Sequence, residues 1–380
     1  MSKQHISIFD TTLRDGEQAP GNSMDVATKV AIGKAMATLG VDVIEVGFPS
    51  SSKEDQEAAE KLGASVSPDV RLCVFARCRE RDIRVAADTM RHRENWEMEL
   101  LVPGSVSHAM RRGLHAKEAI DETIEYVHLA KQAGAPHVSV GLEDATRGSL
   151  DFLQEVIARA ADAGAEKIVI ADTVGCMLPN EFGSLVSAVV GFTREAGQTV
   201  AVHTHDDLGL ATANAISAII NGAHEVQATI CGLGERAGNA ALEEIVGALI
   251  GHPNLSQKFS TKVNPALLPH VATLVSRYVD YPIPRNKAII GRFVFSTEAG
   301  IHQAGMLRAA DSYLFLDPGM FGREPEFIFG RHSGLHALYH LAKKFNWPDT
   351  MVEQAMGILK NSSYSIGELE LLSRLTEGGI

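Results

Sequence analysis

Residues 167–207 read KIVIADTVGCMLPNEFGSLVSAVVGFTREAGQTVAVHTHDD, and this stretch decides the fold. Two short runs rich in β-branched residues, 167–171 and 200–202, flank a longer segment with helical spacing of its apolar residues. Each run leads directly into polar residues, Asp172-Thr173 after the first and His203-Thr204-His205 after the second. A strand, a helix and a second strand in this order predict a parallel β-α-β unit with polar groups at the carboxyl ends of its strands.

The same alternation occupies the first two thirds of the chain. Further strands are expected at 5–9, 43–46, 71–75, 97–102, 137–140 and 225–230. Eight parallel strands predict a closed (β/α)₈ TIM barrel, and a doubly wound open sheet is the alternative. Polar residues follow nearly every strand, and a barrel brings all these strand ends to one face, whereas an open sheet spreads them along an edge. The pattern therefore favours the barrel.

The remaining third of the chain has a different character. Several prolines punctuate residues 252–285 around one helical piece at 267–278, and further helical segments follow. We therefore expect a barrel over 1–251, a linker over 252–285 and a mainly helical C-terminal region over 286–380, with no separate regulatory domain.

Composition excludes several classes of function. The chain has 380 residues, of which 45% are apolar and 22% charged, as in ordinary globular proteins with a large core. The formal charge is −12 and no run of Lys and Arg stands out, so we expect no nucleic-acid partner. Neither a membrane span nor a signal peptide is expected. The four irregularly spaced cysteines predict no disulfide framework, and a cytoplasmic location follows.

His203-Thr204-His205 places two imidazoles two residues apart at the end of a strand. Because side chains alternate along a strand, both point the same way and can bind one metal ion. Asp15, after the first strand, can add a carboxylate, since the first and last strands of a barrel are neighbours. The alternative is that one histidine is an ordinary core residue. Ligand type alone does not choose among Zn²⁺, Mn²⁺, Co²⁺ and Mg²⁺.

The loop of residues 10–18, DTTLRDGEQ, is dense in polar groups. Arg14 can neutralise an anionic oxygen beside a metal held by Asp15, an arrangement that suits a 2-oxo acid. The alternative is a capped turn with a solvated ion pair. Residues 232–239, GLGERAGN, lack the full dinucleotide-binding pattern and the P-loop pattern, so their glycines are expected to let the backbone approach a ligand closely.

Three long motifs together resemble one family. They are DTTLRDGEQ at 10–18, HTHDDLGLATAN at 203–214 and GLGERAGN at 232–239. They resemble the metal-dependent enzymes that condense an acyl-CoA with a 2-oxo acid, including 2-isopropylmalate, homocitrate and citramalate synthases, within the metallolyase barrel group. The similarity covers nearly the whole chain.

This resemblance implies roles for individual residues. The divalent metal would be bound by the residues Asp15, His203, His205 and Asn239. Arg14 would contact the 2-oxo group, and Thr173 the acceptor's carboxylate. Gln18 and Arg77 are further expected substrate contacts.

The resemblance also implies an apparatus for removing a proton from acetyl-CoA. His302 would be the catalytic base, with Glu143 as its carboxylate partner and Tyr313 nearby. Such a pair suits the chemistry because the methyl group of a thioester is a weak acid. In the family this histidine reaches the barrel of a neighbouring subunit, which implies a homodimer.

The acceptor is the least defined part of the prediction. Arg79 follows the third strand, and its planar guanidinium suits a carboxylate or phosphonate. This favours an acceptor with a second anionic group, such as 2-oxoglutarate, oxaloacetate or phosphonopyruvate. If Arg79 instead points to solvent, a neutral acceptor such as 2-oxoisovalerate or pyruvate is the alternative.

The sequence is less consistent with two other functions, a lyase and a non-catalytic binding protein. A 3-hydroxy-3-methylglutaryl-CoA lyase would cleave its substrate rather than condense two substrates. Such lyases carry a cysteine in the glycine-rich loop after the eighth strand, and this chain has Gly234-Glu235-Arg236 in that loop. A non-catalytic binding protein of the same fold would be expected to have lost Arg14, Asp15 or a histidine of the pair. All of these residues are present.

Overall fold

The computed structural model describes residues 3–309, 312–362 and 364–377. The chain divides into two compact units, residues 1–283 and 284–380, and each unit is described by itself.

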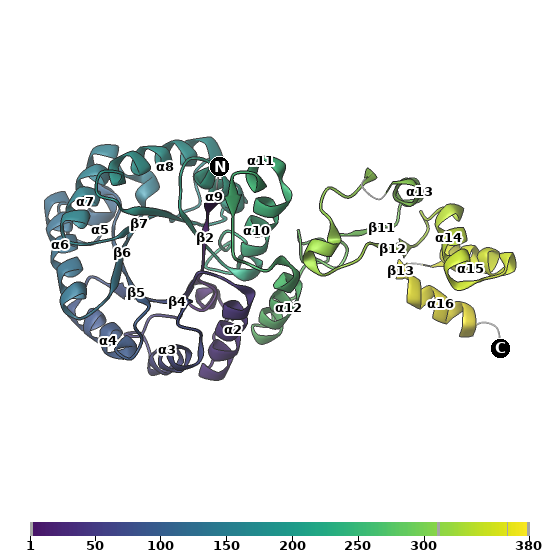
Figure 1. The fold of residues 1–380 in the computed structure, drawn as a ribbon, viewed down its shortest axis with the longest axis horizontal. Coiled ribbons are helices and arrows are strands. Elements are labelled where there is room, and N and C mark those ends of the chain that lie inside the picture. The colour runs from purple at the N-terminus through teal and green to yellow at the C-terminus, as the bar shows by residue number, and fades with distance from the viewer. Residues whose placement is uncertain (1–2, 310–311, 363, 378–380) are drawn as a thin grey trace. The chain divides into compact units, whose positions relative to one another are not determined.

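The first unit is built on a closed barrel of eight parallel strands (Figure 1). In barrel order the strands are β2 (Ser7–Asp10), β3 (Val43–Glu45), β4 (Arg71–Arg77), β5 (Trp96–Pro103), β6 (His137–Glu143), β7 (Lys167–Asp172), β8 (Thr199–Thr204) and β9 (Glu225–Ala228). β9 pairs with β2 in parallel, from Ser7 with Glu225 to Asp10 with Ala228, which closes the barrel. The predicted TIM barrel is confirmed, and the open sheet is excluded.

Helices between the strands form the outer layer around the barrel (Figure 1). They are α2 (Val26–Leu39), α3 (Lys53–Ser65), α4 (Glu80–Met90), α6 (Ala116–Gln132), α7 (Leu150–Asp162), α8 (Pro179–Thr193), α9 (Ala211–Ile220) and α10 (Leu242–Gly251). α7 shows why such segments become helices here. Ser149 caps its first turn by accepting from the Phe152 backbone N–H, and Val156 and Ala160 are among the side chains that it buries.

Short elements complete the first unit. They are β1 (Gln4–His5), α1 (Asp15–Gln18), α5 (Val106–Arg111), α11 (Pro253–Ser256), β10 (Phe259–Ser260) and α12 (Leu268–Tyr278). β1 pairs with β10, so the two ends of this unit are joined by backbone hydrogen bonds. The segment 252–285, expected as a linker, therefore lies almost entirely within the compact first unit.

Buried charges fill the amino end of the barrel interior. The Nζ atom of Lys167 lies 2.9 Å from Glu97 Oε1 and 2.5 Å from Glu225 Oε1, and all three side chains are buried. Arg71 Nη1 lies 3.3 Å from Glu97 Oε2 and adds a second cation, and because an unpaired buried charge is costly, the two carboxyl groups are tolerated only beside these cations. They close the floor of the barrel and leave its carboxyl end available for a site.

The second unit combines helices with a small sheet. Its helices are α13 (Gly300–Arg308), α14 (Leu335–Phe345), α15 (Asp349–Asn361) and α16 (Glu368–Glu377), and its sheet has the order β11 (Ser296–Thr297), β12 (Glu326–Phe329), β13 (Ile366–Gly367). Leu338, Leu341 and Leu359 contribute to its core. The helical C-terminal region is confirmed, and the three-stranded sheet is an addition to it.

No helix in the described ranges is both long and apolar enough to cross a membrane.

Candidate active site at the carboxyl end of the barrel

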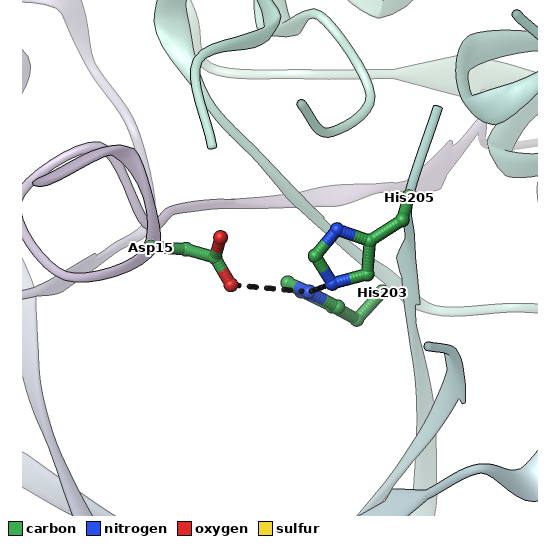
Figure 2. Close-up of side chains that lie close together, drawn as sticks. All are labelled: Asp15, His203 and His205. Atoms are coloured by element: carbon green, nitrogen blue, oxygen red, sulfur yellow. Dashed lines mark hydrogen bonds and ion pairs between the residues drawn. The ribbon is translucent and has the colours of Figure 1, made fainter. Parts of the chain in front are cut away.

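Three side chains from two distant parts of the chain converge at the carboxyl end of the barrel (Figure 2). Asp15 is the first residue of α1, His203 lies near the end of β8, and His205 follows that strand directly. The Nε2 atoms of the two histidines are 3.3 Å apart, and Asp15 Oδ2 lies 3.4 Å from His203 Nε2. All three residues are buried. Two imidazole nitrogens and a carboxylate oxygen facing one another form a donor set suited to a divalent cation.

The charges around this cluster favour metal binding. Burial would by itself raise the pKa of Asp15, but Arg14 and His203 hold that pKa well below its ordinary value. Burial, followed by the neighbouring His203, lowers the pKa of His205 to about 4. At neutral pH the carboxylate is therefore ionised and the His205 imidazole is neutral, which are the forms that ligate metals.

Asn239 completes the surroundings of Asp15. Its amide nitrogen donates to Asp15 Oδ1 at 2.9 Å and to the Leu233 carbonyl at 3.1 Å, while its buried Oδ1 has no partner among the described residues. A buried amide oxygen without a partner is costly, and a cation would satisfy it. A Cβ at Gly234 would lie 2.3 Å from Asn239 Nδ2, so the glycine-rich loop makes room for this contact.

Arg14 is fixed beside the cluster. Its Nη1 donates to Asp15 Oδ2 at 2.8 Å, its Nε lies 2.8 Å from Glu45 Oε2, and its guanidinium stacks 5.0 Å from the centre of the Phe75 ring. Against the effect of burial, Glu45 and Asp15 raise the pKa of Arg14 above its ordinary value. The guanidinium is therefore a permanent, oriented positive charge.

A buried lysine holds the loop that carries Arg14 and Asp15. Lys29, on α2, contacts Glu17 Oε2 at 2.5 Å and also donates to Asp55. Asp55 in turn accepts from the backbone N–H of Phe48 at 2.8 Å. Lys29 therefore ties the loop after β2 to the loop after β3.

Lys29→Met is expected to lower the free energy of unfolding by about 3–5 kcal/mol, because it leaves Asp55 and Glu17 without their shared cation. Urea denaturation followed by circular dichroism measures this change. Lys34→Met, at an exposed position of the same helix, is the matched control and should change little. Equal stability of the Lys29→Met and Lys34→Met proteins would show that this buried lysine does not hold the loop.

A cavity of about 270 Å³ opens beside the cluster. Eight of the expected site residues line it: Arg14, Asp15, Gln18, Arg77, Glu143, Thr173, His203 and His205. Apolar side chains, among them Phe75, Leu101 and Val169, form part of its wall. The cavity thus joins the candidate metal ligands to a space of the size of a small organic acid.

Arg79, which was expected to meet the acceptor if it faces inward, is not among the residues that line this cavity. Arg79 is exposed, precedes α4 as its N-cap residue, and does not line the cavity. β4 ends at Arg77, two residues before Arg79. The alternation of side chains along the strand therefore does not extend to Arg79 and does not direct its side chain inward. Arg77 is the arginine of this strand that reaches the cavity, where it stacks on Phe48 and pairs with Asp82 through Nε at 2.7 Å.

Glu143 and Thr173 occupy neighbouring strand ends. The Glu143 carboxylate lies 3.3 Å from His108 Nε2. Thr173 accepts a hydrogen bond from the backbone N–H of Asp144 at 2.8 Å, which fixes the hydroxyl at the edge of the cavity.

His302 and Tyr313 belong to the second unit. His302 lies on α13, and its ring stacks on that of Tyr313 with 4.2 Å between ring centres. Both side chains are exposed and line a cavity that also includes Arg308 and His332. The partnership of His302 with Glu143 stays a prediction.

Sequence reasoning missed three polar residues of the barrel cavity. Glu45, Glu99 and Gln227 lie within apolar strands, are almost fully buried, and either line the cavity or contact Arg14. The signal that could have identified them is an acidic or amide side chain at an inward position of a strand. Burying such a group costs free energy unless it is paired or hydrogen-bonded, so its presence there indicates a structural or functional role.

Comparison with known proteins agrees with this geometry. Residues 5–275 match the HMGL-like family, and residues 289–363 match the homocitrate synthase post-HMGL domain. Similar proteins include 2-isopropylmalate synthase of Acetivibrio thermocellus, 40% identical over 90% of this chain and 67% of that protein. The 2-isopropylmalate synthase of Heliobacterium modesticaldum is 39% identical over 91% of this chain and 68% of its own length.

Solved structures support the fold. The HMG-CoA lyase of Bacillus subtilis superposes with a TM-score of 0.62 at 18% identity, over 75% of this chain and 97% of that one. The hydroxymethylglutaryl-CoA lyase of Pseudomonas aeruginosa gives 0.62 at 19% identity, over 74% and 95%. At these identities the likeness concerns the fold alone.

The family matches, the identity to the synthases and the converging site residues lead to one conclusion: the chain belongs to the HMGL-like family, among its acyltransferase-type enzymes with a homocitrate synthase post-HMGL domain.

Proposed function

We propose that this protein condenses acetyl-CoA with a 2-oxo acid and that water then hydrolyses the resulting thioester, which releases CoA and an alkylmalate-type or homocitrate-type product. The observation that carries the proposal is the convergence of Asp15, His203 and His205 beside Arg14 in one cavity at the carboxyl end of the barrel. A divalent cation and a fixed guanidinium together suit an acceptor that carries a carbonyl next to a carboxylate.

The residues present fit a divalent metal ion. Asp15, His203 and His205 would hold it, and the unpartnered Oδ1 of Asn239 is a further oxygen donor. When bound, Zn²⁺, Mn²⁺, Co²⁺ or Mg²⁺ would polarise the acceptor carbonyl as a Lewis acid.

Arg14 and Thr173 would orient the acceptor. Arg14 is held by Glu45 and Asp15, so its Nη atoms can meet negative charge that develops on the 2-oxo oxygen without reorganisation. The Thr173 hydroxyl would contact the carboxylate, and Gln18 and Arg77 line the same cavity.

A histidine base would generate the nucleophile. His302, stacked on Tyr313, would remove a proton from the acetyl methyl group, and Glu143 would orient the imidazole. We propose that His302 acts in the barrel of a second copy of the chain, so that the active enzyme is a homodimer.

The acceptor is proposed here as a 2-oxo acid without a further commitment to its side chain. The reason to expect a distal anionic group, as in 2-oxoglutarate, oxaloacetate or phosphonopyruvate, was Arg79, which lies outside the cavity. Of the neutral acceptors, 2-oxoisovalerate agrees with the name 2-isopropylmalate synthase of the similar proteins, and pyruvate is the other neutral acceptor considered.

A screen of 2-oxo acids with acetyl-CoA and a thiol reagent tests the reaction. We expect release of free CoA that depends on one of the acceptors, is lost after treatment with a chelator and returns when a divalent metal is added. CoA release that survives exhaustive chelation, or that needs no acceptor, would contradict the proposal.

A further inference from the structure

Two polar side chains on opposite strands line the barrel cavity. Glu99 lies on β5 and Gln227 on β9, strands that stand opposite each other in the eight-stranded barrel. Gln227 Nε2 donates to Glu99 Oε2 at 2.6 Å, so the pair spans the interior. Both residues line the cavity that holds Arg14 and Asp15, and they are 3% and 1% exposed.

Each member of this pair has one oxygen left over. Gln227 Oε1 is buried without a partner among the described residues, and the bond from Gln227 to Glu99 uses Oε2, which leaves Glu99 Oε1 outside that bond. Gly141 lies beside that carboxyl, since a Cβ added there would be 3.2 Å from Glu99 Oε1. The absence of a side chain at position 141 therefore keeps the carboxyl accessible from the cavity.

The environment of Glu99 disfavours a negative charge. Burial, followed by the neighbouring Glu45, raises the pKa of Glu99 to about 8. Glu45 is itself committed to Arg14. The Glu99 carboxyl is therefore largely protonated at neutral pH and can both donate and accept a hydrogen bond.

These groups restrict what the far end of an acceptor can be. An acceptor that reacts at Arg14 and Asp15 places its side chain in the rest of the cavity, between apolar walls and the Glu99–Gln227 pair. A methyl end would leave the polar pair without hydrogen-bond partners. A carboxylate end has no hydrogen to donate to Gln227 Oε1, and it would lie in the same cavity as the buried Glu45 carboxylate that already holds Arg14.

We propose that the preferred acceptor is a 2-oxo acid whose side chain ends in a neutral hydrogen-bonding group, a hydroxyl or an amide, recognised by Glu99 and Gln227. This inference rests on the proposed condensation and names its substrate class. Because sites built to hydrogen-bond a substrate group reject the analogue that lacks it, the pair acts as the specificity determinant of the cavity.

Three acceptors that differ at the far end test this inference with the metal-loaded enzyme. They are 4-hydroxy-2-oxobutanoate, which ends in a hydroxyl, 2-oxopentanoate, which has a methyl in its place, and 2-oxoglutarate, which ends in a carboxylate. We expect kcat/KM for the hydroxyl acceptor to exceed that for the methyl acceptor by about 10- to 100-fold, the effect of leaving buried polar groups unpaired. The carboxylate acceptor should also be inferior.

Variants then assign the preference to Glu99. Glu99→Leu should abolish or reverse the hydroxyl-to-methyl ratio, whereas Glu99→Gln, which still offers a donor and an acceptor, should keep part of it. Glu80→Gln makes the same chemical change at an exposed position of α4 and should leave the ratio unaltered.

The outcomes separate this inference from the proposed function. If no 2-oxo acid supports CoA release, the proposed condensation fails. If CoA is released but the wild type prefers the methyl or carboxylate acceptor, the inference fails alone. It fails also if Glu99→Leu leaves the ratio unchanged. Should Glu99→Leu not fold, the wild-type ratio and the Glu99→Gln variant still decide the question.

Discussion

Asp15→Asn and His203→Ala are each expected to abolish acceptor-dependent CoA release while the barrel stays folded. Asp15 supplies the negative oxygen of the cluster and also pairs with Arg14 at 2.8 Å, and His203 stands between Asp15 and His205. Loss of a Lewis acid worth several kcal/mol corresponds to about 10³-fold or more in kcat. Metal content by mass spectrometry, alongside CoA release, measures both parts of the effect.

His128→Ala is the matched control for these variants. His128 is exposed on α6, away from the cavity, so its replacement should change neither metal content nor turnover. Circular dichroism of the Asp15→Asn and His203→Ala proteins distinguishes loss of metal from loss of fold. Turnover within a few-fold of wild type in either variant would show that this cluster is not the metal site of the reaction.

His302→Ala is expected to slow the exchange of acetyl methyl protons with solvent by about 10²- to 10⁴-fold, the usual contribution of a general base. Binding of the 2-oxo acid should be nearly unchanged, because His302 lies in the second unit and the proposed acceptor contacts lie in the barrel. Proton exchange followed by NMR in deuterated buffer measures the first quantity, and calorimetric titration with the 2-oxo acid the second.

A histidine elsewhere in the second unit provides the comparison. His340→Ala, on the exposed side of α14, should exchange the methyl protons like the wild type. If His302→Ala also exchanges them normally, another group is the base. If the variant loses acceptor binding as well, the histidine has a role in the site other than proton transfer.

The barrel could be predicted because its determinants are local. Strands and helices alternate with clear boundaries, and left-handed glycines end helices where expected, as Gly40 does with φ 93° while its N–H bonds the Met36 and Ala37 carbonyls. The His203 and His205 pair could also be predicted, since two residues two apart in a strand share a face whatever the barrel's details.

Other features depend on where each strand ends and on what lies opposite it. Arg77 and Arg79 look equivalent in the sequence, but the strand ends at Arg77, and only Arg77 lines the cavity. The Glu99–Gln227 contact joins residues 128 positions apart on opposite strands. The local pattern of apolar residues cannot predict such a contact, because the contact depends on how the whole barrel closes and on the stagger of its strands.

The central claim is that the barrel site forms a carbon–carbon bond between the acetyl methyl group and a 2-oxo acid. The most direct measurement supplies acetyl-CoA labelled with ¹³C in the methyl carbon, together with the best acceptor from the screen, and follows the label by NMR. The account predicts that the label appears as a methylene carbon bonded to the former 2-oxo carbon, in equal amount to free CoA, and only in the metal-loaded enzyme. Label recovered solely as free acetate, with the acceptor unconsumed, would contradict it.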